Sequence, residues 1–186
     1  MKGIKLDYLS AIFICLSLFI SCGSDVDFNQ TENIRPTPIF ESSLIFSSLE
    51  APDFIDDTTQ QERLILTDTT RLEYINSDFF VNQILKTELT FLFSNSLNRA
   101  FNVDFIFVND ADEQRYIAQM EVFAGQPESP AFIASNFLIE EPDLSLFEEA
   151  TTLIYRITLP PTTSPIEPLD LGALKLESKS TFYFEL

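Results

Sequence analysis

The sequence predicts an all-β protein, an antiparallel immunoglobulin-like β-sandwich, and three observations lead to this fold class. From Ile39 onward, short runs of branched and aromatic residues alternate with polar residues at the period of two that is typical of strands. Turn-forming residues separate these runs at spacings of roughly 8 to 15 residues. Neither a βαβ rhythm nor a repeat of about 20 to 50 residues is visible. A closed barrel is the alternative that these patterns leave open.

The clearest strands lie in the middle of the chain. Leu89, Phe91 and Phe93 share one face of a strand over residues 87–94, and alternate residues from Phe101 to Phe107 share one face of the next. We expect these two strands to form a hairpin, which a third antiparallel strand over residues 115–124 extends. Other strands are predicted at residues 43–47, 62–67, 71–75, 131–139 and 151–159, and at 174–179 with 181–186, as two runs or one long bent strand.

Two segments have helical rather than strand spacing. Phe80 and Ile84 lie four residues apart behind Ser77, whose hydroxyl can cap a helix, so residues 77–86 are predicted as a short helix. Leu144 and Phe147 predict one helical turn within residues 142–150. Pro160 ends the strand before it, because proline has no N–H to donate to a sheet.

The first 21 residues have the pattern of a secretory leader. Lys2 and Lys5 precede an apolar run over residues 9–20. This run is too short for a spanning helix, which needs about 20 apolar residues. The sequence therefore predicts a signal peptide over residues 1–21.

A cysteine follows the leader directly, in the order Ser21-Cys22-Gly23-Ser24. This end resembles the lipobox of bacterial lipoproteins, although Phe19 and Ile20 stand where leucine and a small residue are commoner. The resemblance implies that the leader is cut before Cys22 and that Cys22 carries the lipid that anchors the chain to the membrane. The implied order is a signal peptide over 1–21, a lipidated acidic tether over 22–38 and a β-sandwich domain over 39–186.

Three polar residues, Ser24, Asp25 and Asp27, lie close behind the lipidated cysteine. They resemble the short export signal of Bacteroidota lipoproteins, which implies attachment to the outer membrane and exposure on the cell surface. The alternative is that Asp25 and Asp27 only solvate a flexible tether.

The composition excludes several classes of function. The chain has 11 basic and 29 acidic residues and a formal net charge of −18 at pH 7, so nucleic acid and anionic lipid are poor partners. It has no histidine, which excludes Ser-His-Asp and Cys-His nucleophiles and the usual zinc sites. Cys15 leaves with the leader and Cys22 is lipidated, so we expect no disulfide, no metal-binding thiol and no cofactor.

The abundant carboxylates do not predict a catalytic pair. Residues adjacent on a strand point to opposite faces, whereas the two carboxyls of a glycosidase face each other about 5 to 10 Å apart. We therefore expect no enzyme. The adjacent pairs are Asp56-Asp57, Asp112-Glu113, Glu140-Glu141 and Glu148-Glu149.

Calcium is the one metal that so acidic a chain could attract. Asp110, Asp112 and Glu121 match three positions of an EF-hand-like loop, but Arg115 stands where that loop needs glycine. This spacing disfavours calcium there, and a loose site around Asp56 and its neighbours stays open.

Two predicted strands, over residues 101–108 and 131–139, are apolar on both faces, so each must be covered twice. The covering layer is either the two helical segments or a partner protein. We expect an exposed apolar patch that docks another envelope protein and that includes one of four residues, Ile106, Val108, Ile133 or Phe137.

The function that fits these features is a non-catalytic accessory, binding or assembly subunit of an outer-membrane or cell-surface protein complex. The alternative is a glycan-binding or glycan-processing surface lipoprotein. That alternative requires exposed aromatic residues flanked by polar ones, or facing carboxylates.

Overall fold

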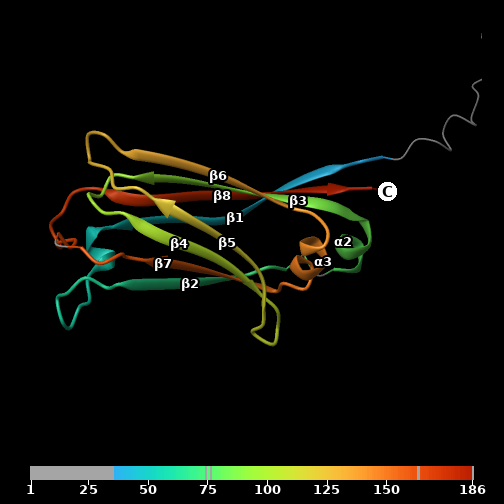
Figure 1. Cartoon of the computed structure of the whole chain (residues 1–186), viewed down its shortest axis with the longest axis horizontal. Helices are drawn as coiled ribbons and strands as arrows, with labels where there is room; N and C mark the ends of the chain where they lie inside the picture. Colours follow the sequence, from blue (N-terminus) through green and yellow to red (C-terminus); the bar gives the residue numbers. More distant parts are fainter. Residues whose placement is uncertain (1–35, 74, 76, 163, 186) are drawn as a thin grey trace, which may run out of the picture. The chain divides into compact units, whose positions relative to one another are not determined.

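The computed structural model describes residues 36–73, 75, 77–162 and 164–185. Over these residues the chain forms two antiparallel four-stranded sheets that pack face to face (Figure 1). The predicted antiparallel β-sandwich is confirmed. Its strands are β1 (Ile39–Glu50), β2 (Ile65–Arg71), β3 (Ile84–Asn95), β4 (Phe101–Val108), β5 (Gln114–Val122), β6 (Ala131–Ile139), β7 (Thr152–Thr158) and β8 (Ala173–Phe184).

The strand order specifies which kind of sandwich this is. One sheet has the order β1-β8-β3-β6 and the other has the order β2-β7-β4-β5. Each strand therefore lies in the sheet opposite to the strand that follows it in the sequence, except that β4 and β5 lie in the same sheet. This is the arrangement of an eight-stranded jelly roll, which combines two Greek keys. The last strand, β8, is a single long strand, as one of the two predicted alternatives has it.

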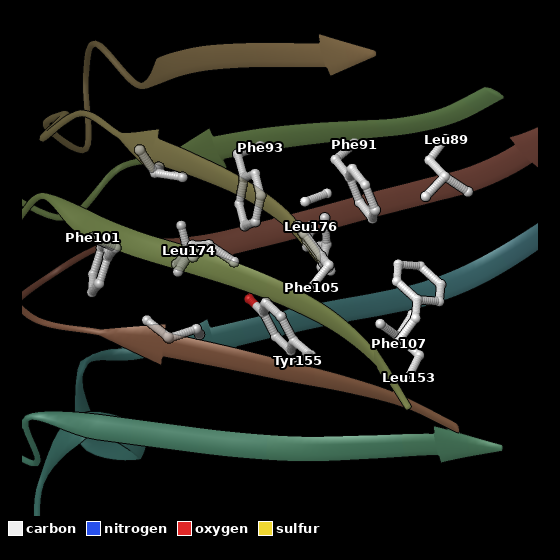
Figure 2. Packing of buried hydrophobic residues seen from close by; sticks show 14 of the residues in the cluster. Leu89, Phe91, Phe93, Phe101, Phe105, Phe107, Leu153, Tyr155, Leu174 and Leu176 are labelled. Atoms are coloured by element: carbon white, nitrogen blue, oxygen red, sulfur yellow. The ribbon is translucent and has the colours of Figure 1, made fainter. Parts of the chain in front are cut away.

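The core lies between the sheets and is built largely from phenylalanine. The rings of Phe91 on β3 and Phe105 on β4 stack with their centroids 3.6 Å apart, and Tyr155 on β7 stacks on the other side of Phe105 at 5.4 Å (Figure 2). Burial raises the pKa of Tyr155 far above its ordinary value, so its phenol stays neutral. The period-two alternation of β3 and β4 thus fills the space between the sheets from both sides.

The predicted hairpin between residues 87–94 and 101–108 is wrong, although both segments are strands. β3 pairs with β6 and β8, whereas β4 pairs with β5 and β7 in the other sheet. The connection crosses between the sheets because its own residues are buried: Leu97 is 1% exposed, and the amide of Asn95 donates to the carbonyl oxygens of Arg99 and Phe123. The predicted antiparallel pairing of β4 with the strand after it is confirmed.

Two further predicted strands, over residues 62–67 and 71–75, are replaced by the single strand β2. Its ladder with β7 runs without interruption from Ile65 opposite Thr158 to Arg71 opposite Thr152. The polar residues Asp68 and Thr69, which lie between the two predicted strands, are part of this strand. Polar residues are tolerated there because β2 is an edge strand of its sheet.

Both predicted helices are present, and they close one end of the sandwich (Figure 1). In α2 (Asp78–Gln83), Phe80 packs edge-on against Phe182 and Phe184 of β8, and the Ser77 hydroxyl accepts the capping hydrogen bond from the Phe80 N–H. In α3 (Asp143–Phe147), Phe147 packs against Phe107. These helices therefore extend the core and do not cover the outer faces of the sheets.

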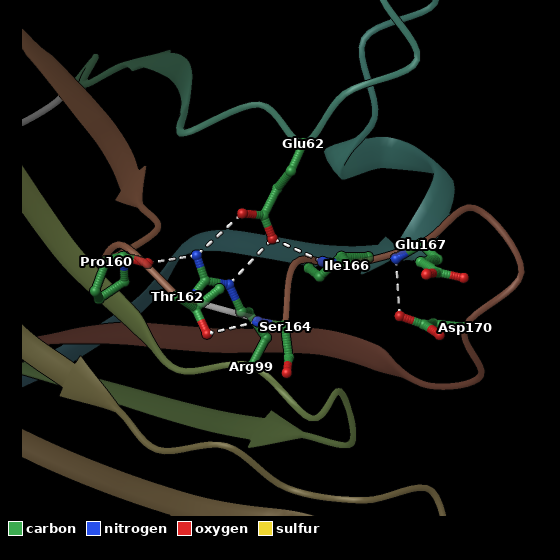
Figure 3. Close-up of polar contacts among 8 residues, drawn as sticks. All are labelled: Glu62, Arg99, Pro160, Thr162, Ser164, Ile166, Glu167 and Asp170. Carbon is green, nitrogen blue, oxygen red and sulfur yellow. Dashed lines mark hydrogen bonds and ion pairs between the residues drawn. The ribbon is translucent and has the colours of Figure 1, made fainter.

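At the other end, a buried ion pair joins three connections (Figure 3). The Arg99 guanidinium donates to both carboxylate oxygens of Glu62, at 3.1 and 3.0 Å, and also to the carbonyl oxygen of Pro160. Glu62 in turn accepts the N–H of Ile166 at 2.9 Å. The two charged side chains are 5% and 7% exposed. Near them, the short helix η2 (Ala51–Phe54) buries Phe54 against Phe101.

Candidate binding groove

An apolar groove of about 600 Å³ opens on the side of the sandwich where β1 and β2 are the edge strands. The start of β1 forms one wall, the end of β2 and the following residues form the other, and α2 and the end of β8 complete it. Its volume lies in the range of small-molecule and peptide sites. The apolar residues that line it are Pro38, Ile39, Phe40, Leu44, Leu72, Ile75, Phe79, Phe80, Phe182 and Phe184.

The groove exists because small side chains stand where a core usually has large ones. Ser42 of β1 and Ser180 of β8 are opposite each other in the ladder, and the Ser180 hydroxyl donates to the carbonyl oxygen of Ser42 at 3.3 Å. Thr70 faces the groove from β2. These three side chains fill less volume than the phenylalanines elsewhere in the core, so the sheets leave a hollow between them.

Large apolar side chains form the rim of the groove and remain exposed to solvent. Phe40 is 54% exposed and Phe79 is 59% exposed, although each packs against a buried phenylalanine of β8. Ile39 is 61% exposed beside them. A contiguous exposed apolar surface of this kind marks an interaction site in most proteins that have one.

The charged groups of the groove are few. Among the lining residues that the structure describes, Arg71 and Glu73 are the ionisable ones. Just outside, on the outer face of β1, Glu41 binds Lys179 at 2.7 Å, and this hydrogen bond and charge hold the pKa of Glu41 below its ordinary value. The lining therefore offers apolar contacts and a few hydroxyls, which suit binding of an apolar group.

A second exposed apolar surface lies on the outer face of the β1-β8-β3-β6 sheet. Phe46 is 73% exposed, Leu92 is 45% exposed and Phe132 is 78% exposed. Two shallow hollows of about 290 and 330 Å³ flank Leu92, one beside Phe46 and the other beside Phe132, and both contain Glu177. Lys175 and Lys179 add positive charge to this surface.

Two of the four predicted docking residues, Ile106 and Val108, are buried, so the prediction is wrong for them. Ile106 and Val108 are 7% and 5% exposed. Ile106 lies in one row with Ile117 of β5 and Ile154 of β7, so three branched side chains cover one another on the outer face of that sheet.

The other two docking residues lie on the inner face of β6. Ile133 and Phe137 are partly buried and pack against the core, and Phe137 contacts the ring of Phe91 with centroids 6.0 Å apart. The exposed large apolar residues of β6 are instead Phe132 and Leu138. In the sequence, both alternate sets of β6 contain large apolar residues, so the pattern does not reveal which set faces inward.

The carboxylates singled out in the sequence do not gather around a metal. Among the described residues, no group of three or more Asp, Glu, His or Cys side chains is placed to hold a metal ion. The Asp56 carboxylate accepts hydrogen bonds from the backbone N–H groups of Thr59 and Thr58, and these hydrogen bonds lower its pKa. It also forms an ion pair with Arg63. Elsewhere, burial and then the charge of Glu141 raise the pKa of Glu148.

Several predicted sites lie outside the described residues. They are the lipidation site Cys22 and the export residues Ser24, Asp25 and Asp27. Within the described part of the chain, no helix has both the length and the apolar character needed to cross a membrane.

Comparisons with known proteins address the fold alone. No family model matches the sequence, and no curated protein matches it. Among solved structures, the VP2 subviral particle of infectious bursal disease virus gives a TM-score of 0.46 at 5% identity, over 79% of this chain and 32% of that one. A candidate secreted protein from Parabacteroides distasonis ATCC 8503 gives a TM-score of 0.46 at 10% identity, over 63% of this chain and 37% of that one. This chain spans about a third of the length of both structures.

Proposed function

We propose that this protein is a non-catalytic lipoprotein, anchored to the bacterial outer membrane, that binds another protein within an envelope or cell-surface complex. One observation carries the proposal: an apolar groove whose rim exposes Phe40 and Phe79 by more than half. Keeping large apolar side chains in water costs about 25 cal/mol per Å², so an uncovered groove is unfavourable. A bound partner would remove that cost.

The test is crosslinking in the native envelope followed by purification of the protein. Phe79→Ser removes an exposed aromatic side chain from the rim of the groove. Phe123→Ser is the matched control, because Phe123 is 60% exposed, nearly the same as Phe79, and does not line the groove. We expect the wild type and the Phe123 variant to yield the same crosslinked partner and the Phe79 variant to lose it. Equal crosslinking of all three proteins would contradict a binding role for the groove.

Glycan binding is the second candidate, and the outer-face surface around Leu92 favours it. Exposed Phe46 and Phe132 are flanked there by Lys175, Glu177 and Lys179, and sugar rings stack on aromatic faces beside polar groups. Electrophoresis through gels that contain cell-surface polysaccharide would show retarded migration of the wild type. The double variant Phe46→Ala/Phe132→Ala should then migrate without retardation. Identical migration of both proteins, with and without polysaccharide, would remove this candidate.

Lipid anchoring is tested at the predicted lipidation site. Cys22 is the one cysteine that remains after removal of the predicted leader. We therefore expect Cys22→Ser to abolish metabolic labelling with a fatty-acid analogue and to leave the leader uncleaved. A variant that still takes up the label would show that the lipoprotein assignment is wrong.

The predicted export signal is tested by its two charges. Replacing Asp25 and Asp27 with alanine should change the protein from protease-accessible on intact cells to protected, while its fold stays the same. Circular dichroism of the purified protein checks the fold. If protease reaches both forms equally, the two aspartates serve only as a tether.

A further inference from the structure

The groove lies beside an open edge of β1, where backbone hydrogen-bonding groups point away from the neighbouring strand. β1 pairs with β8 on one side, and within the described ranges no strand pairs with its other side. The Phe184 N–H donates to the Pro38 carbonyl oxygen at 3.0 Å, which makes these two residues a directly hydrogen-bonded pair. Hydrogen-bonded pairs alternate with unbonded ones along an antiparallel ladder. The N–H and C=O groups of Ile39, Glu41 and Ser43 therefore point away from β8, toward the open edge, where the Ser43 carbonyl oxygen accepts a hydrogen bond from the Ser42 hydroxyl at 3.3 Å.

The same stretch of β1 presents its alternate side chains to the groove. Phe40 and Ser42 lie on the inner face and line the groove, whereas Glu41 lies on the outer face with Lys179. A strand laid along this edge would follow the same alternation, so every second side chain would enter the groove between β1 and β2. Backbone pairing and side-chain burial would then occur together, as they do when a peptide adds to a sheet edge.

This edge also lacks the usual protection against pairing. Proteins commonly protect open edges with lysine, proline or an early bulge. Residues 39–43 contain neither lysine nor proline, and the bulge in β1 comes only after Ser43. β6 is another edge strand without charges, but its inward side chains Ile133 and Phe137 already pack on the core. β1 is thus an edge strand that combines open backbone groups with an unfilled groove.

Charge indicates what kind of strand fits. The chain carries a formal net charge of −18, so its field attracts a basic segment and repels an acidic one. We propose that β1 accepts an extended, basic segment of another polypeptide as an added strand, whose alternate apolar side chains fill the groove. This inference rests on the proposed binding role of the groove and specifies the form of its partner.

The probe is a fluorescent seven-residue peptide that alternates lysine and valine, and the control peptide has the same residues with the valines contiguous. We expect the alternating peptide to bind the purified domain at least about tenfold more tightly than the control, measured by fluorescence anisotropy. Salt should weaken this binding, because the attraction is partly electrostatic. No binding of the alternating peptide at concentrations up to about 1 mM would overturn the proposal.

Two further measurements separate strand addition from side-chain binding alone. Ser43→Pro removes one outward N–H from the open edge and leaves the pairing with β8 intact, because proline is tolerated where its nitrogen faces away from the ladder. It should weaken peptide binding about tenfold, whereas Phe123→Ser should not. Without any substitution, the peptide should slow amide hydrogen exchange at Ile39, Glu41 and Ser43. Unchanged exchange at these three amides would overturn strand addition even if the Ser43 variant fails to fold.

The outcomes also distinguish this inference from the function on which it rests. Loss of the crosslinked partner in Phe79→Ser but not in Ser43→Pro would keep the binding role and overturn strand addition. Retention of the partner in both variants would overturn both. A fluorescent fatty acid that binds the groove and that the peptide does not displace would assign the groove to an acyl chain instead and overturn the inference.

Discussion

Replacing Phe105 with alanine is expected to lower the free energy of unfolding by about 3 to 5 kcal/mol. Phe105 is fully buried and stacks between Phe91 of one sheet and Tyr155 of its own sheet, so its removal leaves a cavity at the contact of the two layers. Urea unfolding followed by circular dichroism measures the effect as a lower midpoint with an unchanged slope. A loss below about 1 kcal/mol would show that the neighbouring rings close the cavity.

Two residues on the opposite face of β4, Ile106 and Val108, provide a related test. Ile106→Asp and Val108→Asp should destabilise the domain as severely as Phe105→Ala, because each would bury a carboxylate without a partner at a position that is 7% or 5% exposed. Leu138→Asp is the matched control, since Leu138 is 54% exposed on the outer face of β6, and it should fold normally. A folded Ile106→Asp protein would restore the outer face of β4 as a candidate docking surface.

Local alternation explains how much of this fold could be predicted. Leu89, Phe91 and Phe93 point inward because strand side chains alternate, and this pattern needs no knowledge of the rest of the chain. The helix after Ser77 was predictable for a similar reason, because the capping residue and the spacing of its apolar side chains are local.

The pairing of β4 with β5 could be predicted, but the partners of β3 could not, because they depend on which sheet each strand joins. The residues between β3 and β4 look like an ordinary hairpin connection in the sequence, and only the buried Leu97 and the inward amide of Asn95 turn them into a crossing between sheets. Gly125 supports this crossing, because a Cβ at its position would collide with the carbonyl oxygen of Asn95. Neither contact has a signal in the sequence.

The candidate groove was equally beyond prediction. Its lining comes from four separate segments, the start of β1, the end of β2, α2 and the end of β8, which only the jelly-roll order brings together. The local signal was weak, because Ser42 and Ser180 lie in strands that contain several other serines and charged residues. Such residues gain meaning only when both are known to face the same hollow.

Replacing Arg99 with methionine is the second large effect, with an expected loss of about 3 to 5 kcal/mol of unfolding free energy. The Glu62 side chain is 7% exposed, and the substitution removes the positive charge that pairs with its carboxylate. The hydrogen bond from the Ile166 N–H to that carboxylate then remains. The substitution also removes the hydrogen bond that Arg99 donates to the Pro160 carbonyl oxygen. The connections around residues 62, 99 and 160–166 therefore lose the side chain that links them. Urea unfolding measures the loss, and Lys179→Met, which breaks an exposed ion pair, is the control that should shift the midpoint far less.

A second substitution tests whether the uncompensated charge causes the loss. Glu62→Gln removes the charge but keeps an oxygen that can accept the Ile166 N–H. The double variant Arg99→Met/Glu62→Gln should therefore be more stable than Arg99→Met alone, because no buried charge remains without a partner. The losses of unfolding free energy from the two substitutions could instead simply add. In that case the stability of this end of the sandwich comes from the packing of the Arg99 side chain and from its hydrogen bond to the Pro160 carbonyl oxygen.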